Sequence, residues 1–342
     1  MLSQPLEVGN YRPYHLTFAC AVPINAYRKG SLSLSGAILA GVFAVITLVL
    51  CPTLVFAIPL LVFFFAGSKA TKYKAGVKAA LEESEHSAPA STKADFKLRK
   101  KSDEKPNGTK AKDLSSGNRD AYQVACNGLV GTLACLVWVW QFGTFFSYGT
   151  QEAIPCPVSD AVKRNEAMQI SNALVFTAVG FWAACMGDTL ASELGMLANT
   201  KPILITSGRP VPPGTNGGIT AWGTFVSGAG GAIIALAALL VLISENNTCT
   251  FTLNTLAGIK FVTVFIGMGI FSGLFGSLLD SLLGATVQET LYSETTKRVV
   301  HQRRAGDKVV RIQGQPILSN NAVNAVSSTV TALICGYIGW SL

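Results

Sequence analysis

The sequence predicts an all-α, multi-pass integral membrane protein, a helical bundle with about six to seven transmembrane helices. Three observations lead to this prediction. Hydrophobic residues make up 49% of the 342 residues, and charged residues make up only 13%. Soluble domains usually carry roughly 25% charged residues. The mean hydropathy is positive, at +0.40. The apolar residues also gather in runs of roughly 20, the length of a helix that crosses a bilayer.

The first 31 residues form an N-terminal segment that we expect to be cytoplasmic or interfacial. The segment includes Arg12, Arg28 and Lys29 and has no apolar core long enough for a signal peptide. Residues 14–26 are mildly apolar, which is typical of a helix that lies at the membrane surface.

Seven apolar segments follow. Little more than Cys51 and Pro52 separates the first two, so residues 32–67 are expected to form a tight hairpin or a broken span. The last segment is polar at its start and apolar later. The expected spans are approximately residues 32–50, 52–67, 121–143, 168–186, 221–243, 258–283 and 321–341.

The connection formed by residues 68–120 differs sharply from its neighbours. It is rich in Lys, Glu, Ser and Pro and holds too few apolar residues to build a core. We expect a basic, largely disordered cytoplasmic loop that acts as a solvated tether. Residues 121–342 then form the membrane core with the candidate site.

The distribution of basic residues predicts the orientation. Residues 68–120 and 285–320 are rich in Lys and Arg, which favours the cytoplasmic side. Residues 144–167 hold two basic residues and residues 244–257 hold none, so these loops are expected on the other side. This threading places residues 187–220 on the cytoplasmic face, and we expect the endoplasmic reticulum or another internal membrane.

Two features of the expected non-cytoplasmic loops agree with this orientation. Asn246, Asn247 and Thr248 form a glycosylation sequon. Cys156 and Cys249 lie in these two loops and are a candidate disulfide pair. Sequons also arise by chance, so both interpretations stay open.

Several function classes do not fit the sequence. The net charge of +8 is concentrated in two loops, as membrane orientation requires, so nucleic-acid binding is not expected. Most of the eight cysteines lie in or beside apolar runs, where cysteine is usually a packing residue. No CxxC pattern occurs and only three histidines are present, which argues against zinc. No GxxxxGK[ST] motif occurs, which excludes a P-loop enzyme.

Two aspartates stand out at the ends of predicted spans. Asp188 follows the fourth span and Asp280 lies near the end of the sixth. Glycine-rich stripes in these spans indicate close helix packing, but packing does not explain a carboxylate, which is costly near a membrane interior. An alternative is that Asp188 caps a helix that begins at Thr189.

The threading brings Asp188, Asp280, Arg119, Asn127 and Asn324 to one face, together with the loop formed by residues 201–218. Two carboxylates with nearby amides and hydroxyls suit Mg²⁺, which prefers oxygen ligands and often bridges phosphates. The loop's backbone N–H groups, with Lys201 and Arg209, suit phosphate. A helix N-terminus at Thr189 would add a positive end. These features predict binding of a nucleotide or a phosphorylated lipid at the membrane surface.

Five blocks of the sequence resemble one integral-membrane family. The blocks are GDTLASELG (187–195), KPILITSGRPVPPGTNGG (201–218), FGSLLDSLLGATVQ (275–288), SLSLSGA (31–37) and GNRDAYQVACNG (117–128). In these blocks the chain resembles the family that contains transmembrane protein 19 and plant phytyl-phosphate kinase. The resemblance extends from about residue 11 to the C-terminus, and residues 80–116 look like an insertion.

This resemblance implies a relation to CTP-dependent lipid kinases and cytidylyltransferases. It implies that Asp188 and Asp280 bind the divalent metal and that Lys201 and Arg209 neutralise the nucleotide. Residues expected to contact metal, phosphate or substrate are Thr189, Ser192, Thr215, Asn216, Gly217, Arg119 and Asn127, with Lys72 as a further candidate.

We therefore expect a Mg²⁺-dependent kinase that uses CTP or another nucleotide and acts on an isoprenoid, phytyl-like monophosphate. Two alternatives stay open. A non-catalytic scaffold would recruit partners through residues 68–120. A transporter would use its glycine-rich helices, although the polar residues gather at one face and not at mid-membrane.

Overall fold

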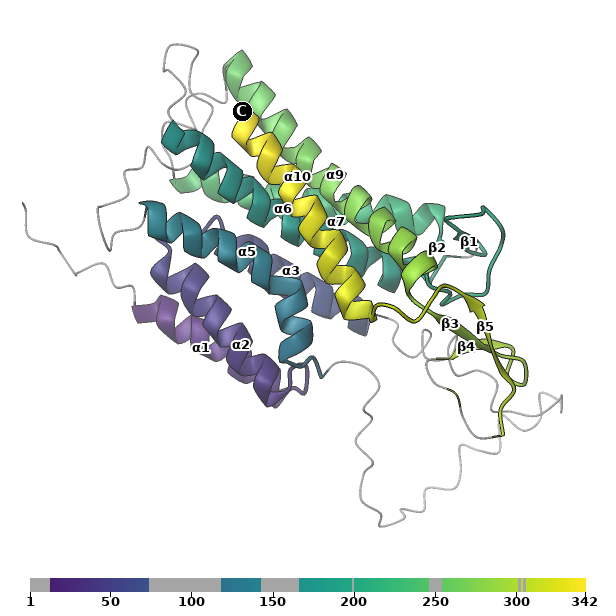
Figure 1. The fold of residues 1–342 in the computed structure, drawn as a ribbon. Helices are drawn as coiled ribbons and strands as arrows, with labels where there is room; N and C mark the ends of the chain where they lie inside the picture. The colour runs from purple at the N-terminus through teal and green to yellow at the C-terminus, as the bar shows by residue number, and fades with distance from the viewer. Residues whose placement is uncertain are drawn as a thin grey trace, which may run out of the picture.

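The computed structural model describes residues 13–73, 118–142, 166–198, 200–245, 254–300, 303 and 306–342. Within these ranges, five helices are long and apolar enough to cross a membrane. They are α5 (Ala121–Phe142), α6 (Glu166–Gly195), α7 (Ala221–Glu245), α9 (Leu256–Val287) and α10 (Asn320–Ser341). Figure 1 shows them packed side by side, which confirms the predicted all-α, multi-pass bundle. The sequon at Asn246 and the cysteines Cys156 and Cys249 lie outside the described residues.

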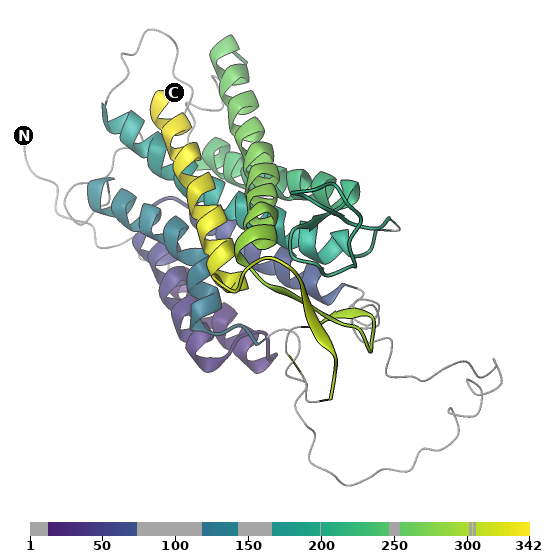
Figure 2. The same ribbon diagram turned by 45° about the vertical axis from the view of Figure 1, so that its right-hand side comes forward.

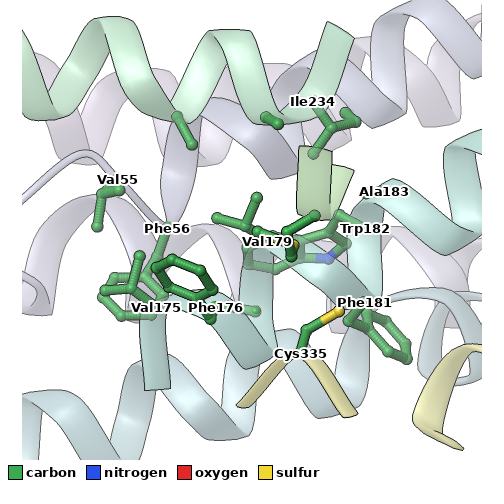
Figure 3. Packing of buried hydrophobic residues seen from close by; sticks show 14 of the residues in the cluster. Val55, Phe56, Val175, Phe176, Val179, Phe181, Trp182, Ala183, Ile234 and Cys335 are labelled. Carbon is green, nitrogen blue, oxygen red and sulfur yellow. The ribbon is translucent and has the colours of Figure 1, made fainter. Parts of the chain in front are cut away.

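Helix α6 is the central element of the bundle. It packs against α3, α5, α7, α9 and α10, and its side chains from Val175 to Gly187 are buried almost without interruption. A helix that is apolar on every side is buried in a protein core or spans a membrane, and these contacts place α6 in the core of the bundle. Figure 3 shows Phe176, Val179 and Trp182 of α6 among side chains from its neighbours, including Phe56 and Cys335.

The glycine stripes bring helix backbones together, as predicted. A Cβ atom added to Gly187 of α6 would lie only 2.5 Å from the Cα atom of Gly273 in α9. On α7, a Cβ atom at Gly231 would collide with the backbone of Gly269. Helices in a bilayer gain little from hydrophobic exclusion, so van der Waals contact between small residues holds them together.

The N-terminal region adds shorter helices on one side of the bundle. They are α1 (Pro13–Arg28), α2 (Leu34–Val45), its π-helical continuation η2 (Ile46–Leu50) and α3 (Ala57–Lys72). The expected span over residues 52–67 therefore begins later, because Cys51 to Phe56 form a turn. Buried Thr53 donates its hydroxyl, and Leu54 its backbone N–H, to the carboxylate of Glu245 at the end of α7. This bond pair fixes the turn to the bundle.

Two small antiparallel sheets lie at one end of the bundle, which we call the strand end (Figures 1 and 2). Strand β1 (Ile203–Leu204) pairs with β2 (Gly218–Ile219). Strand β3 (Thr290–Ser293) pairs with both β4 (Arg298–Val300) and β5 (Val309–Gln313). Helices α6 and α9 end, and α7 and α10 begin, at this end. Both strand regions differ from the plain loops that the sequence predicts for residues 201–218 and 285–320.

One local expectation is wrong. Helix α6 runs without interruption from Glu166 to Gly195, so no helix begins at Thr189 and Asp188 is not an N-cap. Gly187 does not break the helix, because it serves the close contact with Gly273. The residues after Asp188 include good helix formers such as Leu190 and Ala191. The N–H groups there are used inside α6, so they offer no helix N-terminus to a phosphate.

Candidate functional site

The candidate site is a pair of carboxylates between α6 and α9 at the strand end. Asp188 follows Gly187, whose backbone contacts Gly273 of α9, and Asp280 lies two turns further along α9. The close approach of the two helices brings the carboxyl groups within electrostatic range of each other. Both side chains are partly buried. The structure thus brings together the two aspartates that the sequence analysis singled out.

Helix α10 supplies hydrogen-bond donors to Asp280. The hydroxyl of Ser327 donates to Oδ2 of Asp280 over 3.2 Å. With the amide of Asn324 oriented so that its nitrogen faces these acceptors, Nδ2 donates to the same Oδ2 over 3.0 Å and to the carbonyl oxygen of Asn320 over 2.8 Å. Asn324 and Ser327 are three residues apart and therefore neighbours on the helix. Two donors thus hold one oxygen of Asp280.

No basic side chain balances these two charges in the described part of the chain. Neither Asp188 nor Asp280 forms an ion pair with Lys, Arg or His there. Two carboxylates close together in a partly buried setting are unfavourable unless a proton or a cation neutralises them. The pair therefore has the electrostatic character of a cation site.

The two carboxylates fit a Mg²⁺ ion that takes its other ligands from water and substrate. The described residues contain no cluster of three or more His, Cys, Asp or Glu side chains that could enclose a metal. Mg²⁺ usually binds through one or two carboxylates and takes its remaining ligands from water and substrate phosphates. The carboxylates of Asp188 and Asp280 would hold the ion, while Ser327 and Asn324 orient Asp280.

The loop formed by residues 201–218 is seated on the end of α9, beside Asp280. Gly217 has a φ of +80°, and a Cβ atom there would lie 2.6 Å from the carbonyl oxygen of Ser281. Asn216 donates its side-chain amide to the carbonyl of Glu289 over 3.0 Å and its backbone N–H to Thr290 Oγ1 over 3.1 Å. Buried Thr215 donates its hydroxyl to Pro212 O. These predicted ligands therefore position the loop.

Four other residues that the sequence predicts as ligands form no hydrogen bond with either carboxylate in the described structure. Lys201 and Arg209 are exposed on the loop, and no hydrogen bond or ion pair links their side chains to either aspartate in the described structure. Ser192 is exposed and donates to Thr189 O within α6. The methyl group of Thr189 faces Gly67 of α3. The sequence predicts these residues as ligands, but the structure does not join them to the carboxylate pair.

Arg119 is held in a fixed position just before α5. Its N–H donates to Ser31 O over 3.2 Å, and its carbonyl accepts from the N–H of Ser33 over 3.0 Å. Its guanidinium donates to Ser68 Oγ over 3.4 Å. Burial lowers the pKa of Arg119, and the nearby charge of Glu193 on α6 acts in the opposite direction. Because Glu193 lies five residues beyond Asp188, Arg119 is placed near the same end of α6.

Arg119 also lies at the polar end of an apolar cavity. Helices α1, α2, α3 and α5, together with η2, border this cavity, which is open on one side. Three polar residues line it, Arg119, Gln123 and Asn127. In the sequence these three recur every four residues together with Gly131, but Gly131 packs against Trp182 of α6. Asn127 therefore belongs to this cavity.

Two residues near the candidate site, Ser327 and Glu193, were not predicted from the sequence. Asn324 was expected on the same face as the two aspartates, but Ser327 was not, although the spacing of three residues between them is a usable signal. Glu193, whose charge acts on Arg119, was not predicted either. Nothing in the sequence reveals which serine of α10 points toward α9, because that depends on how α10 is rotated in the bundle.

Comparison with known proteins identifies the family. The model of the family described as integral membrane protein DUF92 matches residues 17–332. This chain belongs to the DUF92 family. Protein PGR of Arabidopsis thaliana is 30% identical to this chain over 318 residues, which cover 92% of this chain and 91% of the relative. An uncharacterised membrane protein of Methanocaldococcus jannaschii is 48% identical over 54 residues, 16% of this chain and 23% of that protein. No solved structure matches.

Proposed function

We propose that this DUF92 protein is a Mg²⁺-dependent kinase that transfers a phosphoryl group from CTP, or another nucleoside triphosphate, to an isoprenoid-type lipid monophosphate. The reaction would take place at the cytoplasmic face of an internal membrane, such as the endoplasmic reticulum. The observation that carries the proposal is the Asp188–Asp280 pair, which lacks a basic partner within the described structure and lies at one end of the bundle.

In the proposed reaction, an oxygen of the acceptor phosphate attacks the γ-phosphorus of the nucleotide. A new P–O bond forms, the bond from the γ-phosphorus to the β–γ bridging oxygen breaks, and its electron pair leaves with the nucleoside diphosphate. The acceptor phosphate is already ionised near neutral pH, so no strong general base is needed. The products are a lipid diphosphate and a nucleoside diphosphate.

Each group in the site has a role in this proposal. When bound, Mg²⁺ would neutralise charge on the β- and γ-phosphates. Asp188 and Asp280 would hold it, with Asp280 oriented by Ser327 and Asn324. Lys201 and Arg209 are exposed on the loop beside the site, where they are available to nucleotide phosphates that arrive from solvent. Arg119 would face the acceptor phosphate.

The family membership supports the membrane setting of this proposal. The resemblance to plant phytyl-phosphate kinase supports the acceptor class. The loop on the end of α9 supports a substrate site near Asp280, because Gly217 contacts Ser281, the residue next to that aspartate.

The test uses the purified protein in detergent with Mg²⁺, CTP or ATP labelled in the γ-phosphate, and a panel of prenyl monophosphates. We expect a labelled prenyl diphosphate from the wild type and none from Asp188→Asn. Glu294→Gln is the matched control, because Glu294 lies in the strand region and pairs with exposed Lys308. Undiminished transfer by Asp188→Asn would contradict the proposal.

The transporter and scaffold alternatives predict other results. A transporter would move a solute into proteoliposomes without forming a diphosphate. A scaffold would lose its function when residues 80–116 are deleted, whereas the kinase should keep its turnover after that deletion.

A further inference from the structure

We infer that the cavity between α1, α2, α3 and α5 binds the hydrocarbon chain of a lipid phosphate, with Arg119 and Lys72 at its mouth facing the phosphate. This inference rests on the proposed function for the choice of acceptor, but its geometry is independent of the carboxylate pair. Nothing in the comparisons assigns a ligand to this part of the chain.

The walls of the cavity have the chemistry of a hydrocarbon site. Apart from Arg119, Gln123 and Asn127, every residue that lines the cavity is apolar. All four helices supply apolar residues to its walls. Typical examples are Phe18 of α1 and Phe43 of α2. The space is open on one side, so a bound chain would be covered by these helices along only part of its surface.

The polar residues gather at one end of this space. Arg119 lies immediately before α5, and Gln123 and Asn127 follow on its first two turns. The first residues of a spanning helix lie near the membrane surface, where a charged headgroup stays in contact with water. The cavity thus has a surface end with a guanidinium and an apolar interior, the same polarity as a lipid with an anionic head and one chain.

A second cation lies beside the first. Lys72, at the end of α3, donates to Ser31 Oγ over 3.2 Å, and the backbone carbonyl of Ser31 accepts from the N–H of Arg119. The guanidinium of Arg119 donates to Ser68 Oγ, and Ser68 lies one turn before Lys72 on α3, so both basic side chains reach the same end of α3. The nearby carboxylate of Glu193 balances part of the charge of Arg119. The guanidinium fork and the ammonium group together suit a phosphate dianion.

The position of this mouth links it to the candidate site. Ser68 of α3 accepts a hydrogen bond from Arg119, and Gly67 contacts Thr189, the residue after Asp188. A phosphate held at Arg119 would therefore lie at the same end of α6 as the carboxylate pair, with its chain directed away between α1, α2 and α3.

The test is a binding experiment without nucleotide or Mg²⁺. A prenyl monophosphate with a photoreactive diazirine at the far end of its chain is bound to the purified protein, irradiated, and located by mass spectrometry of peptides. We expect labelled residues on α1, α2 or α3. Ala40→Phe, which places a ring inside the cavity, should reduce the labelling to background. Ile38→Phe is the matched control on α2, because Ile38 is 62% exposed and does not line the cavity.

A second comparison tests the headgroup. Arg119→Gln should weaken binding of the phosphate probe by about tenfold, the loss expected for a hydrogen bond to a charged group. The corresponding neutral alcohol probe should bind equally to both proteins. Arg119→Lys should restore part of the difference. The backbone bonds of residue 119 to Ser31 and Ser33 do not depend on its side chain, so these variants should fold, as size-exclusion chromatography can verify.

Several outcomes would overturn the inference. Labels on the outer faces of α9 or α10, labelling that Ala40→Phe leaves unchanged, or equal effects of Arg119→Gln on phosphate and alcohol probes would each contradict it. Equal labelling by a photoreactive phospholipid would show a site for bulk lipid. Labelling in the cavity without phosphoryl transfer in the kinase assay would leave the inference standing and refute the kinase. Phosphoryl transfer in the kinase assay, together with photolabels outside the cavity, would support the kinase and refute the inference about the cavity.

Discussion

The hydroxyl of Ser327 on α10 donates a hydrogen bond to Oδ2 of Asp280 on α9, with 3.2 Å between the two oxygens. This contact joins two helices at the carboxylate pair and restricts how Asp280 can turn. Asn324 reinforces it by donating to the same oxygen. The orientation of a metal-binding carboxylate normally depends on such outer partners.

We predict that Ser327→Ala lowers the rate of phosphoryl transfer. It should also raise the Mg²⁺ concentration that gives half of the maximal rate by roughly 10-fold or more, the range seen when an outer partner of a metal ligand is removed. The measurement is the rate of transfer as a function of Mg²⁺ concentration. Thr329→Ala is the control on the same helix, because Thr329 bonds to the backbone carbonyl of Ala325. Equal behaviour of the two variants would show that the contact has no role in metal binding.

A second prediction concerns the contact between α6 and α9. Gly187→Ala adds a methyl group where a Cβ atom would lie 2.5 Å from the Cα atom of Gly273, so the helices must move apart. Such overpacking costs about 1–3 kcal/mol of unfolding free energy, and it should also reduce transfer because Asp188 is the next residue. Gly267→Ala is the control on α9, since no atom lies within 4 Å of its added Cβ. Thermal unfolding of both variants in detergent provides the comparison.

The third prediction tests how the loop is seated. Gly217 and Gly208 both have positive φ, +80° and +67°, so alanine at either position pays a backbone cost of about 1–2 kcal/mol. At Gly217 the new Cβ would also lie 2.4 Å from Cβ of Ala285, whereas Gly208 has open space around it. We expect Gly217→Ala to weaken nucleotide binding clearly more than Gly208→Ala does in an equilibrium binding assay. An equal effect would mean that the position of the loop on α9 is unimportant for the nucleotide.

A fourth prediction addresses stability at the opposite end of α7. Glu245→Ala leaves the hydroxyl of Thr53 and the N–H of Leu54 without their acceptor. An unsatisfied buried donor costs about 1–3 kcal/mol, so the variant should unfold at lower temperature. Phosphoryl transfer measured well below that temperature should change little, because Glu245 is far from the strand end. Unchanged unfolding would show that water replaces the lost acceptor.

The membrane bundle could be predicted from the sequence because long runs of apolar residues are a strong indication of spanning helices. Runs of apolar residues identify spanning helices, and the glycine stripes correctly indicated close packing, as Gly187 and Gly273 show. The break expected at Thr189 was wrong because glycine followed by aspartate is ambiguous, and only the neighbouring helix reveals that Gly187 serves packing. The short strands escaped prediction because pairs such as β1 and β2 depend on distant partners.

For the candidate site, Asp188 and Asp280 could be identified from the sequence. The hydrogen bonds and packing of the residues around them could not. Residue types alone do not show that Thr215 and Asn216 use their donors to seat the loop. They also do not show that Arg119 and Asn127 line an apolar cavity. Both features depend on contacts between segments that are far apart in the sequence.

The central claim is that Asp188 and Asp280 together bind a divalent cation, and the most direct test is a titration with Mn²⁺ followed by electron paramagnetic resonance. The titration is made on the purified protein with a non-hydrolysable CTP analogue. We predict saturable Mn²⁺ binding that Mg²⁺ displaces and that both Asp188→Asn and Asp280→Asn abolish, whereas Glu294→Gln keeps it. Binding that survives in both aspartate variants would contradict the claim and would make the carboxylate pair a structural feature of the bundle.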